Sequence, residues 1–366
     1  MNKHEILQTP IEHIDIKAFD ARPIMDAYAK TAFQARNLAA AADIYSRMLR
    51  DPDCSVILTL AGSLFSAGLK HVVVDMIQHN MVDVIVSTGA IIVDQDFFEA
   101  LGFRHYRGSP VADDRALSRL AIDRIYDTYI DEDQLRVCDM TITRIAEALP
   151  PQPYSSREFI HAMGRYLETE GIKSQESVVL AAYQNGLPIF VPAFSDSSAG
   201  FGLVYHQWHK KNPHLTIDSV RDFRQLTEIK LAAKETGVLM VGGGVPKNFT
   251  QDVVVATDIL GEQRPVHKYA IQLTVADERD GGLSGSTLKE ACSWGKVDLK
   301  YEQMVFGEAT LTFPLLISDA YHWGAWKERK PARFSDRLGV SGEGGLQKGA
   351  ESSLKRCIDQ PIRDDK

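Results

Sequence analysis

Cysteine is scarce in this chain, and no metal-binding pattern of cysteine and histidine is present. The 366 residues contain four cysteines, none of them in C-x-x-C spacing. We therefore expect neither a disulfide framework nor a zinc site. His206, His209 and His214 lie close together in the sequence, but no acidic partner pattern supports a metal site there.

The chain also lacks long apolar runs and an excess of positive charge. No stretch approaches about 18 consecutive apolar residues, and the first residues contain no apolar signal core. We therefore expect no membrane span and a soluble, cytoplasmic protein. The formal net charge of -8 disfavours nucleic acid as a partner.

Short apolar segments that alternate with helical patterns are abundant. This alternation predicts a Rossmann-like α/β fold, in which helices cover both faces of a mostly parallel sheet. Predicted strands with the same short apolar pattern occur both before and after the proline-rich segment 148–153, which indicates a single large domain. The predicted strands are 56–60, 82–86, 188–191, 238–241 and 269–273, and the predicted helical stretches are 24–50, 69–80 and 219–235.

The chain divides into three parts by composition. Residues 1–50 read as a helical segment, 51–334 as the α/β domain, and 335–366 as a polar, glycine-rich tail.

Small and polar residues follow most of the predicted strands. Ligands bind at the carboxyl ends of strands in open parallel sheets, so these residues favour a dinucleotide pocket. Gly242–Gly244 could bring backbone N–H groups close to a phosphate, or could form a tight strand-to-helix turn, and is not G-x-G-x-x-G. Asp196 and Asp280 could bind ribose hydroxyls or cap helices.

The segment Ser293-Trp-Gly-Lys296 carries the candidate nucleophile. A lysine against an aromatic wall is partly desolvated, and desolvation disfavours the ammonium form. A neutral lysine attacks carbonyl and imine carbons. The alternative is an ordinary surface lysine, and no G-x-S-x-G or Cys–His pattern offers another nucleophile.

Several short strings occur in one order along residues 30 to 325. They are Ala32-Phe-Gln-Ala35, Ser63-Leu-Phe-Ser66, Gln78-His-Asn-Met-Val-Asp-Val84, Val191-Pro-Ala193, Gly242-Gly-Gly-Val245 with Lys247, Glu290-Ala-Cys-Ser-Trp-Gly-Lys296 and Phe313-Pro-Leu-Leu316. Together they resemble deoxyhypusine synthase and its bacterial relatives.

The resemblance implies an NAD-dependent aminobutyl transfer. NAD oxidises spermidine to an imine, 1,3-diaminopropane leaves, and Lys296 takes the four-carbon unit as an enzyme imine. An acceptor amine displaces the lysine, and the retained NADH reduces the product. Trp294 and Glu290 would line the amine channel, where an aromatic face and a carboxylate attract an ammonium.

The resemblance also implies a cofactor site and an assembly. Family members form homotetramers with active sites at subunit interfaces, and we expect the same here. The positions that match the NAD site are Ser63, Ser66, Thr88, Gly89, Asp94, Asp196, Gly243, Gly244, Asp280, Ser284, Gly307 and Glu308.

The amine half of the site departs from the family pattern. Phe201 and Leu283 stand where acidic residues are usual, and Asn248 stands at the position of an acid–base histidine. Asp123 replaces an asparagine, which adds one carboxylate. A buried ammonium without a partner is costly, and asparagine cannot relay a proton. We therefore expect the amine to be held differently or to be another amine.

Two smaller changes affect the cofactor half: Glu308 replaces an aspartate, and the spacing at Asp94 differs by one residue.

Three functions remain open. We favour transfer from spermidine or putrescine to a small diamine, which yields homospermidine. The first alternative is modification of a lysine on the hypusine-bearing translation factor. The second is a non-catalytic, NAD-binding regulatory subunit.

Overall fold

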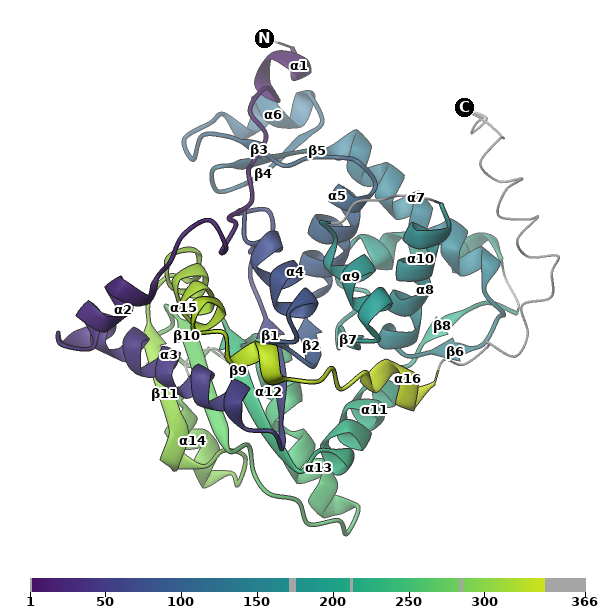
Figure 1. Cartoon of the computed structure of the whole chain (residues 1–366). Coiled ribbons are helices and arrows are strands. Elements are labelled where there is room, and N and C mark those ends of the chain that lie inside the picture. The colour runs from purple at the N-terminus through teal and green to yellow at the C-terminus, as the bar shows by residue number, and fades with distance from the viewer. Residues whose placement is uncertain (1, 171–175, 211–212, 283–285, 340–366) are drawn as a thin grey trace.

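A parallel six-stranded sheet forms the centre of the protein (Figure 1). The computed structural model describes residues 2–170, 176–210, 213–282 and 286–339. Numbered along the chain, the strands lie in the order 3-2-1-4-5-6 of the Rossmann fold, which reverses between β1 and β9. Across the sheet the strands are β7 (Ile189–Phe190), β2 (Val84–Ser87), β1 (Cys54–Leu60), β9 (Glu235–Val241), β10 (Tyr269–Thr274) and β11 (Glu302–Phe306).

Both faces of this sheet are covered by helices because side chains alternate along each strand. Leu58 and Leu60 of β1 point into a core shared with α3 (Phe33–Arg50), α4 (Lys70–Gln78) and α15 (Ala309–Trp323). Ile57 points to the other face, where it packs with side chains from α11 (Ser219–Ala232) and α13 (Val253–Ile259). The inner strands of the sheet are therefore buried on both sides, as is usual in a parallel sheet, whereas the edge strand β11 is only partly buried.

The remaining elements extend this core. A three-stranded antiparallel sheet, β3 (Tyr106–Arg107), β5 (Thr128–Asp131) and β4 (Ile122–Ile125), lies at the top of Figure 1, and β6 (Pro153–Tyr154) pairs with β8 (Thr216–Ile217). The other helices are α1 (Lys3–Ile6), α2 (Arg22–Tyr28), η1 (Ala90–Phe97), α5 (Phe98–Ala100), α6 (Asp114–Arg119), α7 (Glu132–Ala148), α8 (Ser156–Thr169), α9 (Val178–Asn185), α10 (Ser198–His209), α12 (Gly244–Gln251), α14 (Leu288–Ser293), η3 (Leu299–Tyr301), η4 (Ala325–Glu328) and α16 (Phe334–Leu338).

The predicted fold class is confirmed, and all five predicted strands lie in the central sheet. The helical stretch 24–50 is two helices, because the chain leaves helical geometry after α2 ends at Tyr28, and Phe33 takes a positive φ of 55° at the start of α3. The predicted boundaries at residues 50 and 334 stay predictions, and residues 340–366 of the tail lie outside the described part. No helix within the described residues has both the length and the apolarity to cross a bilayer.

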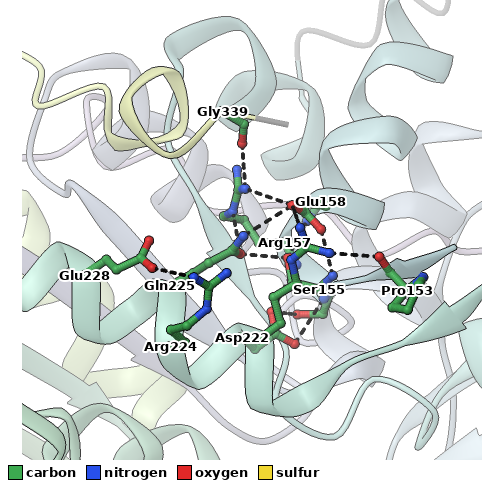
Figure 2. Close-up of polar contacts among 11 residues, drawn as sticks. Pro153, Ser155, Arg157, Glu158, Asp222, Arg224, Gln225, Glu228 and Gly339 are labelled. Carbon is green, nitrogen blue, oxygen red and sulfur yellow. Dashed lines mark hydrogen bonds and ion pairs between the residues drawn. The ribbon is translucent and has the colours of Figure 1, made fainter. Parts of the chain in front are cut away.

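A buried polar network joins α8 to α11 (Figure 2) and continues to the end of β7. Asp222 accepts hydrogen bonds from the backbone N–H and the hydroxyl of Ser156, at 3.0 and 2.9 Å. The same Ser156 hydroxyl accepts a bond from Val191 N at 2.8 Å. Arg157 donates to Gln225 at 3.0 Å and to the Gly339 carbonyl at 2.7 Å. The network therefore fixes the strand end from which the loop with Asp196 departs.

Candidate functional site

The predicted cofactor residues follow the carboxyl ends of all six strands of the central sheet. Because parallel strands end at one edge, the segments that follow these strands leave the sheet on the same side. The assignments are Ser63 and Ser66 after β1, Thr88, Gly89 and Asp94 after β2, Asp196 after β7, Gly243 and Gly244 after β9, Asp280 and Ser284 after β10, and Gly307 and Glu308 after β11.

The loops at this edge contact one another directly. Thr88 N donates to the Leu60 carbonyl at 3.2 Å, which links the loops after β2 and β1. A Cβ placed on Gly89 would lie 2.7 Å from the Ser197 hydroxyl, so only glycine lets the β2 and β7 loops approach this closely. Gly242 has a φ of +79° and lies against the Ala61 carbonyl. Four of the loops therefore form one continuous rim.

Side chains of the π-helix η1 accept hydrogen bonds from the backbone of two of these loops. Gln95 accepts hydrogen bonds from the Phe65 and Ser66 backbone at 2.9 and 3.0 Å. Asp94 accepts one from Ser198 N at 2.7 Å, at the start of α10. Burial raises the pKa of Asp94 to about 6. The structure thus shows Asp94 supporting the loop that carries Asp196.

Other predicted cofactor residues are engaged in local structure. Ser66 is buried, and its hydroxyl donates to the Ser63 carbonyl at 3.0 Å. Glu308 caps α15 by accepting from Thr310 N at 2.9 Å. Asp280 is exposed and accepts from Gly282 N at 3.1 Å, while Ser284 lies outside the described residues.

The turn after α14 places Lys296. Gly295 takes a positive φ of 66°, and Lys296 N donates to the Ala291 carbonyl at 3.0 Å. Glycine commonly ends a helix in this left-handed conformation and reverses the chain. The reversal returns the Lys296 side chain to the Trp294 ring, with 5.4 Å between Nζ and the ring centroid.

A carboxylate that sequence analysis missed contacts this lysine. Lys296 Nζ lies 2.6 Å from Oδ1 of Asp252, and the lysine side chain is only 15% exposed. Asp252 lies between α12 and α13, four residues after Asn248. Positions i and i+4 share a helix face, and this spacing is the one sequence feature that could have directed attention to Asp252.

A second lysine lies close to the first. Lys247 of α12 is fully buried and donates to the Ser286 carbonyl. Burial lowers its pKa to about 8, with Glu290 acting in the opposite direction and Lys296 in the same one. The site therefore contains the side-chain amines of Lys247 and Lys296, with the carboxylates of Asp252 and Glu290 as their neighbours.

Glu290 and Trp294 lie beside this centre. The Glu290 carboxylate accepts from Thr287 N in a capping box, and the Thr287 backbone and hydroxyl bonds lower its pKa. Trp294 is 71% exposed, so its ring offers a solvent-facing wall beside the lysine.

Two other predicted substrate residues, Asp123 and Phe201, lie away from this centre. Asp123 is on β4, paired with Ile130, and burial raises its pKa. Phe201 is exposed on α10. In Figure 1, β4 lies at the top and α10 at the right, while α14 lies at the lower left. Leu283 lies outside the described residues. One chain by itself therefore does not gather all the predicted substrate residues.

Comparisons with known proteins point to a single family. The family model for deoxyhypusine synthase matches residues 23–320. A deoxyhypusine synthase-like protein of Chlorobaculum tepidum is 63% identical over 92% of this chain and 97% of its own length. A protein of Methanosarcina mazei named "Probable deoxyhypusine synthase 2" is 40% identical, over 88% of this chain and 92% of its own.

The fold is shared with solved structures. A crystal structure named for a deoxyhypusine synthase from Entamoeba histolytica matches with a TM-score of 0.56 and 20% identity, covering 85% of this chain and 97% of that one. At this identity the match supports the fold alone. The family match and the close relatives establish that the chain belongs to the deoxyhypusine synthase family.

Proposed function

We propose that this protein is an NAD-dependent aminobutyl transferase that makes homospermidine by transferring a four-carbon unit from spermidine or putrescine to a small diamine. Family membership supports aminobutyl transfer. The observation that carries the proposal is the enclosure of Lys296 between Asp252 and the Trp294 ring. Chemistry on free polyamines also fits the cytoplasmic location that the sequence predicts.

The rim of loops fits NAD. Gly244 starts α12 with a φ of +66°, and a Cβ there would meet nothing within 4 Å, so space is open above the helix N-terminus. Such a terminus attracts a diphosphate. The exposed Asp196 would hold a ribose hydroxyl. When bound, NAD would take a hydride from the donor amine and later return it.

The protein's own residues would handle the amines. Lys296 would attack the oxidised donor carbon and hold the four-carbon unit as an imine. Trp294 and Glu290 would attract ammonium groups. Phe201, Leu283 and Asn248 remove two acidic contacts and one proton relay from the family pattern. This rewritten amine pocket supports a small diamine as the acceptor.

The experiment that tests this function uses a panel of free amines. Purified protein with NAD should release 1,3-diaminopropane from spermidine, and should form homospermidine when putrescine is added. Mass spectrometry of the products measures both. Labelled spermidine with the translation factor tests protein modification in parallel. NAD binding without turnover of any polyamine would contradict the proposal and support a regulatory subunit.

We further propose that a second subunit completes the site within a homotetramer. Four exposed apolar side chains recur at helical spacing on α10: Phe201, Val204, Tyr205 and Trp208. An apolar stripe of this kind commonly marks a protein interface. Because α10 and β4 lie away from Lys296 within one chain, a neighbouring copy could bring their residues to it.

Val204→Asp should lower the oligomer mass and, with it, the activity. Desolvating a carboxylate in an apolar interface is costly, so association should weaken by about tenfold or more. Light scattering after size exclusion measures the mass. Val220→Asp, an equally exposed position on α11, is the control and should leave the mass unchanged. An unchanged mass in Val204→Asp would place the interface elsewhere.

A further inference from the structure

We propose that Asp252 is a catalytic residue that moves a proton between Lys296 and the amine exchanged there. This inference rests on the proposed function, because it concerns the step in which Lys296 acquires the four-carbon unit. It assigns to Asp252 the proton transfer that Asn248 cannot perform.

The geometry favours Asp252 for this role. Its Oδ1 lies 2.6 Å from Lys296 Nζ, within direct proton-transfer distance. The carboxylate makes no cap hydrogen bond to α13, although Asp252 stands at that helix's N-cap position. Its side chain is 43% exposed, so a substrate nitrogen can also approach it. The carboxylate therefore has access to both nitrogens involved in an exchange.

A purely structural ion pair is the weaker explanation. An ion pair with one partner this exposed typically contributes little to stability. Among the described residues, the Lys247 ammonium of α12 interacts electrostatically with Lys296 and with Glu290 of α14, but Lys247 is buried and the Glu290 carboxylate accepts the capping-box bond. Asp252 is thus the acid or base that contacts the nucleophilic nitrogen itself.

The step balances without any further reactant. Lys296 Nζ forms a bond to the carbon of the oxidised donor imine, and a gem-diamine results. Asp252 accepts the proton from Nζ and gives it to the donor nitrogen. The bond between carbon and that nitrogen then breaks, its electron pair leaves with 1,3-diaminopropane, and an imine remains on Lys296. This step involves no oxidation or reduction, since the donor has been oxidised by NAD beforehand.

The experiment separates this step from the oxidation that precedes it. Asp252→Asn with spermidine and NAD should form reduced nicotinamide at close to the native rate in a single turnover. Release of 1,3-diaminopropane should slow by about 10²-fold, the usual scale of proton-transfer catalysis. KM should change little, and Asp252→Glu should restore part of the rate. Asp258→Asn, an exposed carboxylate on the same helix, is the matched control. Release within threefold of native, or equal losses in both steps, would overturn the proposal.

A second measurement is independent of polyamine turnover. Butanal should form an imine at Lys296, which cyanoborohydride traps and mass spectrometry of the Lys296 peptide detects. There, Asp252 would protonate the hydroxyl that leaves the carbinolamine as water. Trapping about 10²-fold slower in Asp252→Asn would support the proton transfer even if no polyamine reacts and the proposed function fails. Equal trapping in the two proteins would refute it.

Discussion

Lys296→Arg should reduce aminobutyl transfer on the order of 10³-fold or more while leaving NAD binding intact. Arginine can replace the ion pair with Asp252 and the contact with the Trp294 ring. Its guanidinium stays protonated, however, and cannot form an imine. The variant therefore removes the nucleophile while it keeps the charge. Release of 1,3-diaminopropane from spermidine measures the loss.

The control for this substitution is another lysine beside an aromatic ring. Lys300 Nζ lies 5.2 Å from the Tyr301 ring centroid, in a pairing similar to that of Lys296 and Trp294. Lys300→Arg should retain native activity. Borohydride with labelled spermidine should label the native protein and not Lys296→Arg. A covalent adduct that persists in Lys296→Arg would show that another residue, with Lys247 as the first candidate, carries the four-carbon unit.

Five of the six strands of the central sheet could be predicted because their signals are local, whereas the partly polar edge strand β11 was not predicted. Segment 238–241 is a continuous apolar run and 56–60 is interrupted only by Thr59, as is usual for strands buried on both faces. The antiparallel sheet of β3, β4 and β5 was not predicted, since its strands have two to four residues and include Asp123 and Arg124. Such short, partly polar strands are stabilised by their partners rather than by their own pattern.

The candidate site could be predicted only in part, for a similar reason. The small residues that follow each strand identify the rim, and the turn at Gly295 accounts for the placement of Lys296. The contact between Lys296 and Asp252 joins residues far apart in sequence and depends on how α12 meets α13. The sequence likewise does not show that Asp94 supports the loop of Asp196.

A buried charge cluster around Glu99 leads to the second large expected effect. Glu99 on α5 accepts hydrogen bonds from His13 at 2.8 Å and from His105 at 2.7 Å, and pairs with Lys70 of α4. The side chains of Glu99 and Lys70 are each 1% exposed. Burial alone would raise the pKa of Glu99, but the two histidine bonds and the Lys70 ammonium outweigh it and lower that pKa. The cluster ties the N-terminal segment to the helix that follows the β1 loop.

Glu99→Gln should lower the free energy of unfolding by about 3–5 kcal/mol at neutral pH. The amide keeps the shape of the side chain but leaves the Lys70 ammonium buried without a countercharge. Because the pKa of Glu99 is lowered by folding, its stabilising effect is complete above the unfolded value of about 4.3 and fades as the pH falls. Urea denaturation measures the free energy of unfolding of both proteins. The difference between native protein and variant should therefore be smaller at pH 4 than at pH 7.5.

Two further variants distinguish a buried charge from a general loss of packing. Glu132→Gln removes an exposed ion pair with Arg136 on α7 and should cost less than about 0.5 kcal/mol. Adding Lys70→Met to Glu99→Gln removes the unpaired ammonium, so the double variant should be more stable than Glu99→Gln alone. A double variant that is no more stable than the single one would mean that the histidine bonds, rather than Lys70, account for the stability that Glu99 provides.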